Sequence, residues 1–206
     1  KQPKQLLRLK GRPILEYSVR AFLECDVITD VVVALPRSVL HDLPEYLRSD
    51  RKHLQVVPGG ARRQDSVAAA FAQVPDRAEI VVFHDAARPL VSESLIRMTV
   101  LWAASTGAAI AAVEATDTVK RGSEGFVVET LPRSEIFLAQ TPQAFRVNVL
   151  RDALALARPD VTATDEATLA EMAGHRVHLV RSGFSNMKIT HPDDLPMAEF
   201  FLAGST

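Results

Sequence analysis

Short apolar runs alternate with amphipathic stretches over the first half of the chain. The runs rich in β-branched residues predict buried strands, and apolar positions spaced three or four residues apart predict helices. Residues 13–24, for example, place Leu15, Val19, Phe22 and Leu23 on one face. The pattern predicts strands at 31–35, 54–57, 80–84 and 108–113, and helices at 13–24, 37–48, 64–74 and 92–106. Strands that alternate with helices indicate an α/β fold with a mostly parallel sheet and right-handed crossovers.

The alternation stops between residues 114 and 139. Residues 116–120 and 126–131 flank the polar segment 121–125, which is typical of a β-hairpin. An isolated hairpin that carries Val119, Phe126, Val127 and Val128 is marginally stable. We therefore expect residues 114–135 to form a protruding β-arm that packs on a second copy of the chain. Beyond it, we expect a strand at 136–139, a polar turn at 140–143, helices at 146–157, 164–173 and 192–203, and a strand at 176–181.

Length and composition narrow the class of protein. The chain has 206 residues, which suits a single domain spanning 1–206. Its 24 basic and 25 acidic residues give a formal charge of -1, so no broad basic surface favours nucleic acid or an anionic membrane. No apolar run approaches the roughly 18 residues of a membrane span. The one cysteine, Cys25, suits a reducing cytoplasm, and we assign it no chemistry.

The run from Val82 to Pro89 contains the clearest candidate chemistry. An apolar strand ends there in His84 and Asp85, and Arg88 follows three residues later. Ligands of open α/β sheets bind at the carboxyl ends of the strands, where these side chains would lie. A carboxylate can hold a metal ion or a sugar hydroxyl, and a guanidinium grips phosphate. The alternative is a purely structural one, in which Asp85 caps the next turn and pairs with Arg88.

Other segments offer weaker signals. Gly59 and Gly60 follow a predicted strand and precede Ser66, an arrangement that lets backbone amides approach an anion or a hydroxyl. A tight strand-to-helix turn explains the same residues. Lys188 alternates with two apolar residues and so points away from the core, whereas Lys4 reads on its own as a surface lysine. The histidines lack metal-site spacing, and His84 has no nucleophile nearby in sequence.

Seven of these segments, taken in order, resemble the 2-C-methyl-D-erythritol 4-phosphate cytidylyltransferases. The resemblance covers almost the whole chain. It rests on Pro3-Lys4-Gln5, Gly59-Gly60 through Arg63 to Ser66-Val67, His84-Asp85-Ala86-Ala87-Arg88-Pro89, Ala115-Thr116-Asp117-Thr118-Val119-Lys120, Thr141-Pro142-Gln143, Thr164-Asp165-Glu166 and Asn186-Met187-Lys188-Ile189-Thr190.

The resemblance implies a Rossmann-like nucleotidyltransferase fold, a three-layer sandwich that forms a cytoplasmic homodimer (plastid stroma in a plant) through its β-arm. It implies that CTP and methylerythritol phosphate react to give 4-diphosphocytidyl-2-C-methylerythritol and pyrophosphate, a step of non-mevalonate isoprenoid synthesis, with Mg²⁺ as the cofactor. The implied catalytic residues are Lys4, Arg133 and Lys188. The implied binding residues are Gly60, Ser66, Asp85, Arg88, Thr118, Thr141 and Thr164, with Asp85 also placing the metal ion.

The chain departs from the family pattern in two places. The family opens with a strand and a glycine-rich loop whose arginine cradles the triphosphate, directly before the Pro-Lys-Gln motif. These 206 residues do not contain that segment, so we expect them alone to bind CTP poorly. Many members also carry an acid where this chain has Ala61, which removes a side-chain contact to the nucleotide.

Two other functions stay open at this point. Ribitol 5-phosphate cytidylyltransferases share most of these motifs, although they usually have a bulkier residue at the position of Ala87. A nucleotide-binding dimer without catalysis is the other alternative. Pyrophosphate release in the presence of each acceptor separates the three.

Overall fold

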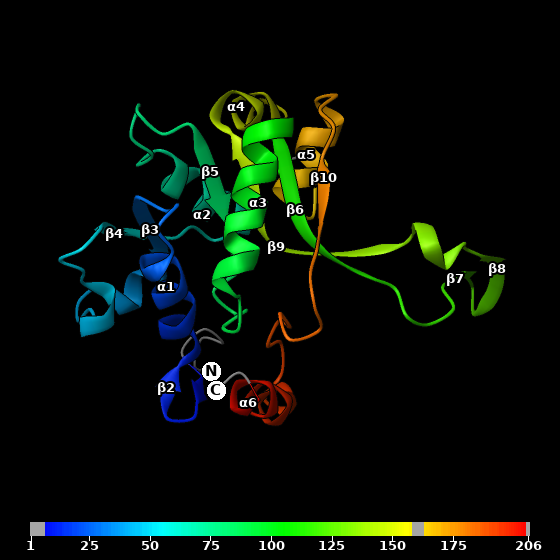
Figure 1. The fold of residues 1–206 in the computed structure, drawn as a ribbon, viewed down its shortest axis with the longest axis horizontal. Coiled ribbons are helices and arrows are strands. Elements are labelled where there is room, and N and C mark those ends of the chain that lie inside the picture. The colour runs from blue at the N-terminus through cyan, green and yellow to red at the C-terminus, as the bar shows by residue number, and fades with distance from the viewer. Residues whose placement is uncertain (1–6, 158–162, 205–206) are drawn as a thin grey trace.

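The computed structural model describes residues 7–157 and 163–204, and Figure 1 shows their arrangement. Lys4 lies outside these ranges. The strands are β1 (Arg8–Leu9), β2 (Arg12–Pro13), β3 (Asp30–Leu35), β4 (His53–Pro58), β5 (Ile80–Phe83), β6 (Ala108–Glu114), β7 (Lys120–Ser123), β8 (Phe126–Thr130), β9 (Phe137–Arg146) and β10 (His178–Arg181). The α-helices are α1 (Ile14–Glu24), α2 (Arg63–Phe71), α3 (Glu93–Thr106), α4 (Val147–Ala155), α5 (Glu166–Met172) and α6 (Leu195–Ala203).

The central sheet is mixed. Its strand order is β10-β6-β9-β5, in which β10 and β6 are parallel and β9 runs antiparallel to both β6 and β5. Strands β3 and β4 pair in parallel as a separate two-stranded sheet. The α/β class predicted from the sequence is confirmed, and the reversed strand β9 is the feature that the prediction of a mostly parallel sheet did not include.

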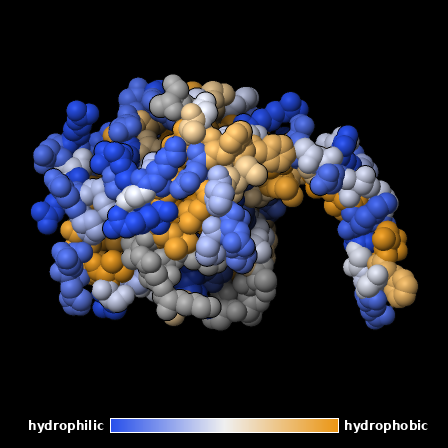
Figure 2. Space-filling view, turned by 90° about the horizontal axis from the view of Figure 1, so that it is seen from below, coloured by the Kyte–Doolittle hydropathy of each residue, from blue (hydrophilic) through white to orange (hydrophobic). Residues whose placement is uncertain are grey.

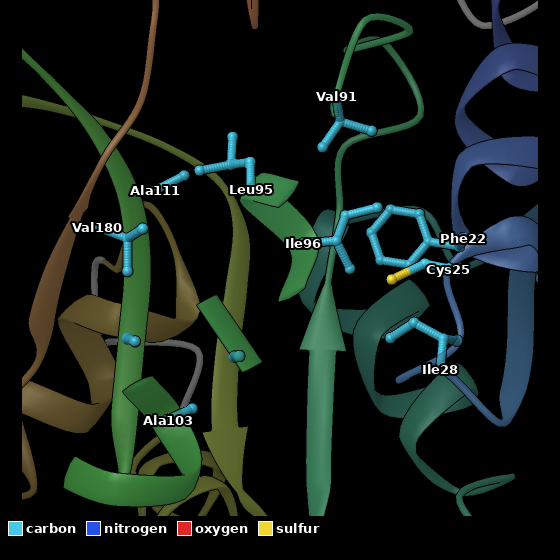
Figure 3. Packing of buried hydrophobic residues seen from close by; sticks show 11 residues of the cluster. Phe22, Cys25, Ile28, Val91, Leu95, Ile96, Ala103, Ala111 and Val180 are labelled. Atoms are coloured by element: carbon cyan, nitrogen blue, oxygen red, sulfur yellow. The ribbon is translucent and has the colours of Figure 1, made fainter. Parts of the chain in front are cut away.

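Helices cover both faces of the central sheet, which gives three layers (Figure 1). Successive residues of a strand point to opposite faces. In β6, Ala109 and Ala111 therefore pack with α1 and α3, whereas Ala108 and Ile110 pack with α4 and α5. Figure 3 shows the first of these two clusters, in which Ile96 of α3 lies next to Phe22 of α1. The small side chains of β6 let the helices on both faces approach closely.

Helix α3 shows how local sequence sets the bounds of an element. The Ser92 hydroxyl accepts a hydrogen bond from the Leu95 backbone N–H and caps the start of the helix. Gly107, with φ of 98°, ends the helix in a conformation that side chains disfavour. The predicted helix thus begins and ends within a residue or two of its observed bounds.

Two predictions of local structure were wrong. Residues 37–48 form two short 3-10 turns, Arg37–Val39 and Glu45–Leu47, because Pro44 interrupts the predicted helix. Residues 140–143 lie inside β9 and are not a turn. The structure buries the side chains of Gln140, Thr141 and Gln143 there. Their polarity predicts contact with water, but they make hydrogen bonds to residues distant in the sequence instead.

The predicted hairpin forms between β7 and β8 and lies away from the rest of the molecule (Figures 1 and 2). Glu124 and Gly125 both have positive φ, as a two-residue hairpin turn requires, so the turn is shorter than the sequence indicated. Phe126, Val127 and Val128 are exposed, with Phe126 78% accessible. Packing of this hairpin on a second copy stays a prediction.

A cavity of about 420 Å³ lies between the β3–β4 pair and the central sheet. Its walls include residues 31–34 of β3, all of β5, and apolar side chains of α1 and α2. At one end it is lined by Arg63, Ser66 and Asp85, all of which belong to predicted motifs. In the described part of the chain no strand lies between β3 and β5. Within the same ranges, no helix has the length and apolarity to cross a bilayer.

Candidate functional site

Asp85 and Lys188 form the centre of the candidate site. The ammonium of Lys188 lies 2.9 Å from Asp85 Oδ2, and the guanidinium Nε of Arg88 lies 3.6 Å from the same oxygen. Asp85 follows the end of β5 after one intervening residue, His84. Lys188 lies in the segment between β10 and α6. The fold therefore brings together three predicted residues from segments about a hundred positions apart in sequence.

The carboxylate of Asp85 is kept ionised by its neighbours. Burial alone would raise the pKa of Asp85, but Lys188, Arg88 and, more weakly, Arg63 lower it below its ordinary value. The Lys188 side chain remains 45% exposed, so its ammonium can reach a ligand in solvent. The site thus holds a fixed negative charge beside positive charges that an anionic ligand can contact.

Backbone hydrogen bonds fix these side chains relative to one another. Arg88 is buried, and its Nη1 donates to the carbonyl oxygen of Asn186 at 2.8 Å. The backbone N–H of Ile189 donates to the carbonyl of Ala87 at 2.8 Å. The segment that carries Lys188 is therefore attached to the turn that carries Asp85 on both sides of the lysine.

The turn after β4 forms a second part of the site. The Gly60 backbone N–H donates to Ser66 Oγ at 3.1 Å, which joins the end of the strand to the first turn of α2. A Cβ atom at Gly60 would lie 2.2 Å from Cβ of Asp65, so only glycine fits this close approach. Gly60 and Ser66, both predicted binding residues, are thus in direct contact.

Arg63 connects α2 to the N-terminal end of α5. Its guanidinium makes two hydrogen bonds of 2.6 Å each to the carboxylate of Glu166. The Glu166 side chain is only 2% exposed, whereas that of Arg63 is 42% exposed. The adjacent Asp165 caps α5 and accepts a hydrogen bond from Gln143 Nε2 at 2.8 Å. The sequence predicts a helix over 164–173, but nothing local to Asp165 and Glu166 indicates their distant partners.

The remaining predicted residues have different surroundings. Thr141 is buried, and its hydroxyl accepts a hydrogen bond from the Asp85 backbone N–H at 2.9 Å. Thr164 is exposed and lies directly before the Asp165 cap. Thr118 is exposed between β6 and β7, and Arg133, also exposed, donates to the Thr116 carbonyl at 2.8 Å. The described contacts do not join Thr118 or Arg133 to Asp85 and Lys188.

A divalent cation fits this site as an ion held by one protein carboxylate together with substrate phosphates and water. Mg²⁺ is commonly held by one or two carboxylates together with substrate phosphates and water. Asp85 supplies such a carboxylate beside the cations that would bind the phosphates. In the described ranges, the one group of three clustered metal-ligating side chains is Cys25, Asp26 and Glu93, outside this site.

The fold and the site define an α/β protein that gathers positive side chains and one carboxylate at the end of β5, an edge strand of the four-stranded sheet. Enzymes of phosphoryl and nucleotidyl transfer depend on this kind of electrostatic positioning. The family model for IspD, 2-C-methyl-D-erythritol 4-phosphate cytidylyltransferase, matches residues 1–204. The chain belongs to this family.

Individual relatives agree with the family match. A 2-C-methyl-D-erythritol 4-phosphate cytidylyltransferase of Acidobacterium capsulatum is 41% identical over 211 residues, covering 98% of this chain and 87% of the relative. The enzyme of the same name from Syntrophus aciditrophicus is 40% identical, with 97% and 88% covered. The crystal structure of the Thermus thermophilus enzyme superimposes with a TM-score of 0.84 at 34% identity and covers 98% of this chain and 95% of that one.

Proposed function

We propose that this chain transfers a cytidylyl group from CTP to 2-C-methyl-D-erythritol 4-phosphate. A phosphate oxygen of the acceptor forms a bond to the α-phosphorus of CTP, and the bond from that phosphorus to the β-phosphate oxygen breaks. The products are 4-diphosphocytidyl-2-C-methyl-D-erythritol and pyrophosphate. The observation that carries the proposal is the contact of Lys188 with Asp85 beside Arg88, in a chain of this family.

The reaction joins two anions, so its main requirement is to hold them in line and screen their charge. Lys188 is half-exposed beside a carboxylate, and we assign it to the attacking phosphate, with Arg88 next to the acceptor. Gly60 and Ser66 hold the cytosine and ribose end of CTP, at the place where the turn after β4 packs closely against the first turn of α2. The other proposed roles are charge stabilisation by Lys4 and lining of the pocket by Thr141 and Thr164.

We propose that Asp85 contacts the ribose and takes part in placing Mg²⁺. A bound Mg²⁺ would neutralise charge on the phosphates of CTP. The low pKa of Asp85 favours this role because the carboxylate stays ionised at neutral pH. The buried free thiol of Cys25 suits a reducing compartment, and we propose the cytoplasm.

We further propose that residues 1–206 form one domain that acts as a homodimer. Thr118 and Arg133 lie at the base of the β7–β8 hairpin, and within the described part of the chain no observed contact joins them to Asp85 or Lys188 of their own chain. The exposed apolar residues of the hairpin would be covered by a second copy, whose site would then receive Arg133. This arrangement accounts for a basic residue that the described contacts leave outside the site.

Pyrophosphate release tests the proposal. The protein in its natural length is supplied with CTP and Mg²⁺, and with methylerythritol phosphate or ribitol 5-phosphate in parallel. We expect release with the first acceptor alone. Release with ribitol 5-phosphate would assign a different acceptor, and release with neither would favour the non-catalytic dimer.

A pair of variants tests the assignment of Lys188. Lys188→Ala should lower turnover about 10²–10³-fold, the usual effect of removing one electrostatic group from a transition state. Arg151→Ala is the matched control, because Arg151 is an exposed cation on α4. Loss of CTP binding in Lys188→Ala with intact chemistry would overturn the role of Lys188.

A further inference from the structure

His84 lies directly before Asp85, and the proposed function gives it no role. Its ring makes a hydrogen bond from each nitrogen, with Nε2 lying 3.0 Å from the carbonyl oxygen of Arg88 and Nδ1 lying 3.1 Å from Thr141 Oγ1. The ring also packs against Phe22 of α1 at a centroid distance of 5.0 Å. The side chain thus connects β9, α1 and the turn that follows β5.

The directions of these hydrogen bonds follow from the groups involved. The Arg88 carbonyl can only accept, so Nε2 carries the hydrogen. The Asp85 N–H can only donate, so Thr141 Oγ1 accepts from it at 2.9 Å. The Thr141 hydroxyl then donates its own hydrogen to Nδ1 of His84.

The residues joined in this way enclose the turn that carries the site. The Arg88 N–H donates to the Asp85 carbonyl at 2.9 Å and closes the turn over residues 85–88. Thr141 holds the first residue of the turn, and His84 holds the carbonyl of the last. Ser18 Oγ adds a hydrogen bond of 3.1 Å to the Ala86 carbonyl. Asp85, which pairs with Lys188, and Arg88 are therefore held at the two ends of the turn by one polar chain.

We propose that His84 is a positioning residue of this enzyme, which together with Thr141 holds the turn over residues 85–88 so that Asp85 and Arg88 meet the substrates in register. The inference rests on the proposed function. Thr141 keeps its proposed place in the lining of the pocket, and its hydroxyl also holds the turn. In this role His84 acts on the substrates through the turn and not by direct contact.

Steady-state kinetics of a double-mutant cycle test this role. The variants are His84→Phe, which keeps a ring of similar size against Phe22, Thr141→Val, and the two combined. A small displacement of catalytic groups can cost up to about a hundredfold in rate. We expect each single variant to lower kcat roughly 10- to 100-fold while the KM for CTP changes less than about threefold. Both substitutions break the same chain of hydrogen bonds. The kcat of the double variant should therefore lie within about twofold of the kcat of the slower single variant.

Three results would overturn the proposal. Effects on kcat that multiply in the double variant would show that His84 and Thr141 act separately. A rise in the KM for the acceptor in Thr141→Val, without loss of kcat, would place Thr141 on the substrate. Unchanged kinetics of His84→Phe in an active protein would remove the role of His84 while leaving the proposed function intact.

Two further measurements complement the cycle, and the first of them depends neither on activity nor on how well His84→Phe folds. Nitrogen-15 NMR of histidine-labelled wild-type protein at pH 7 should show His84 protonated at Nε2, and protonation at Nδ1 instead would contradict the hydrogen-bond directions. His84→Gln places an amide donor toward the Arg88 carbonyl but no acceptor at the position of Nδ1, so it should recover part of the kcat that His84→Phe loses. No recovery in a folded protein would count against the Arg88 contact. His175→Phe is the matched control, because His175 pairs with Asp152 away from the turn, and it should leave kcat unchanged.

Discussion

Arg63→Met should destabilise the protein more than an ordinary surface substitution, because it leaves the buried Glu166 carboxylate without its cation. Glu166 is 2% exposed and receives two hydrogen bonds of 2.6 Å from Arg63. Removing one partner of a fully buried ion pair costs about 3–5 kcal/mol. The Arg63 side chain is 42% exposed, so solvent already screens part of the interaction. We therefore expect the free energy of unfolding to fall by roughly 1.5–3 kcal/mol.

Urea unfolding at pH 7, followed by circular dichroism, measures this change directly. For a domain of this size each kcal/mol shifts Tm by about 2–4 °C, so thermal unfolding should show a loss of roughly 3–12 °C. Arg62→Met is the matched control. Arg62 pairs with Asp65 at the surface, where both side chains are exposed, and such pairs contribute about 0–1 kcal/mol.

A double substitution separates loss of charge from loss of packing. Arg63→Met combined with Glu166→Gln removes the uncompensated carboxylate, so it should be more stable than Arg63→Met alone. Equal stability of Arg63→Met and Arg62→Met would refute the reasoning, because it would show that Glu166 is solvated without its partner. A double variant no more stable than Arg63→Met would point to packing of the arginine stem instead.

Three other perturbations have defined outcomes. Burial lowers the pKa of His84 from 6.5 to about 4, so between these pH values the unfolded chain binds a proton that the folded chain does not. The free energy of unfolding should therefore fall by roughly 2–4 kcal/mol as the pH falls from 6.5 to 4. Urea unfolding at several pH values should show that His84→Phe loses this component, and an unchanged pH dependence in the variant would contradict it. Phe145→Ala empties a fully buried site and should cost about 3–5 kcal/mol, whereas Phe200→Ala, at a residue 71% exposed, should stay within about 0.5 kcal/mol, and equal losses would be inconsistent with the described core. An equimolar, randomly paired mixture of Arg133→Ala and Lys188→Ala chains should regain about a quarter of wild-type turnover, because about half of the dimers are heterodimers and each of these has one intact site of two; verified heterodimers without activity would argue against sharing of Arg133.

Elements with strong local signals were predictable from the sequence. Helix α3 has a serine cap and a glycine stop, and strand β6 is an apolar run of small side chains, so both lie close to the predicted ranges. Residues 37–48 have a helical apolar pattern, but Pro44 limits them to short turns. The polar run inside β9 looks like a turn because its partners are not in the local sequence. Asn186 donates to Gln140 Oε1 and to the Thr141 carbonyl from more than forty residues away.

The sequence singles out the candidate residues one by one, but it does not indicate the contacts between them. Asp85 and Arg88 stand out because a buried strand ends there, and Lys188 because it alternates with apolar neighbours. Their meeting depends on the order and direction of the strands, which short-range patterns do not determine. Arg63 and Glu166 are 103 positions apart, and a charged residue at a helix start gives no sign of burial. The sequence around His84 contains no nucleophile and therefore indicates no catalytic role for it. Its partners in the structure are a backbone carbonyl and a hydroxyl.

The cavity between β3 and β5 has a consequence for how this chain associates. In the described ranges, β3 pairs only with β4 and β5 only with β9, so each presents one backbone edge toward the cavity. Two such edges facing each other can hydrogen-bond an extended peptide on both sides, and the apolar walls from α1 and α2 would bury its side chains. Any strand that enters there gains a complete set of backbone partners. An unpaired strand of a second chain can therefore add to the molecule at this cavity, which is a route to aggregation.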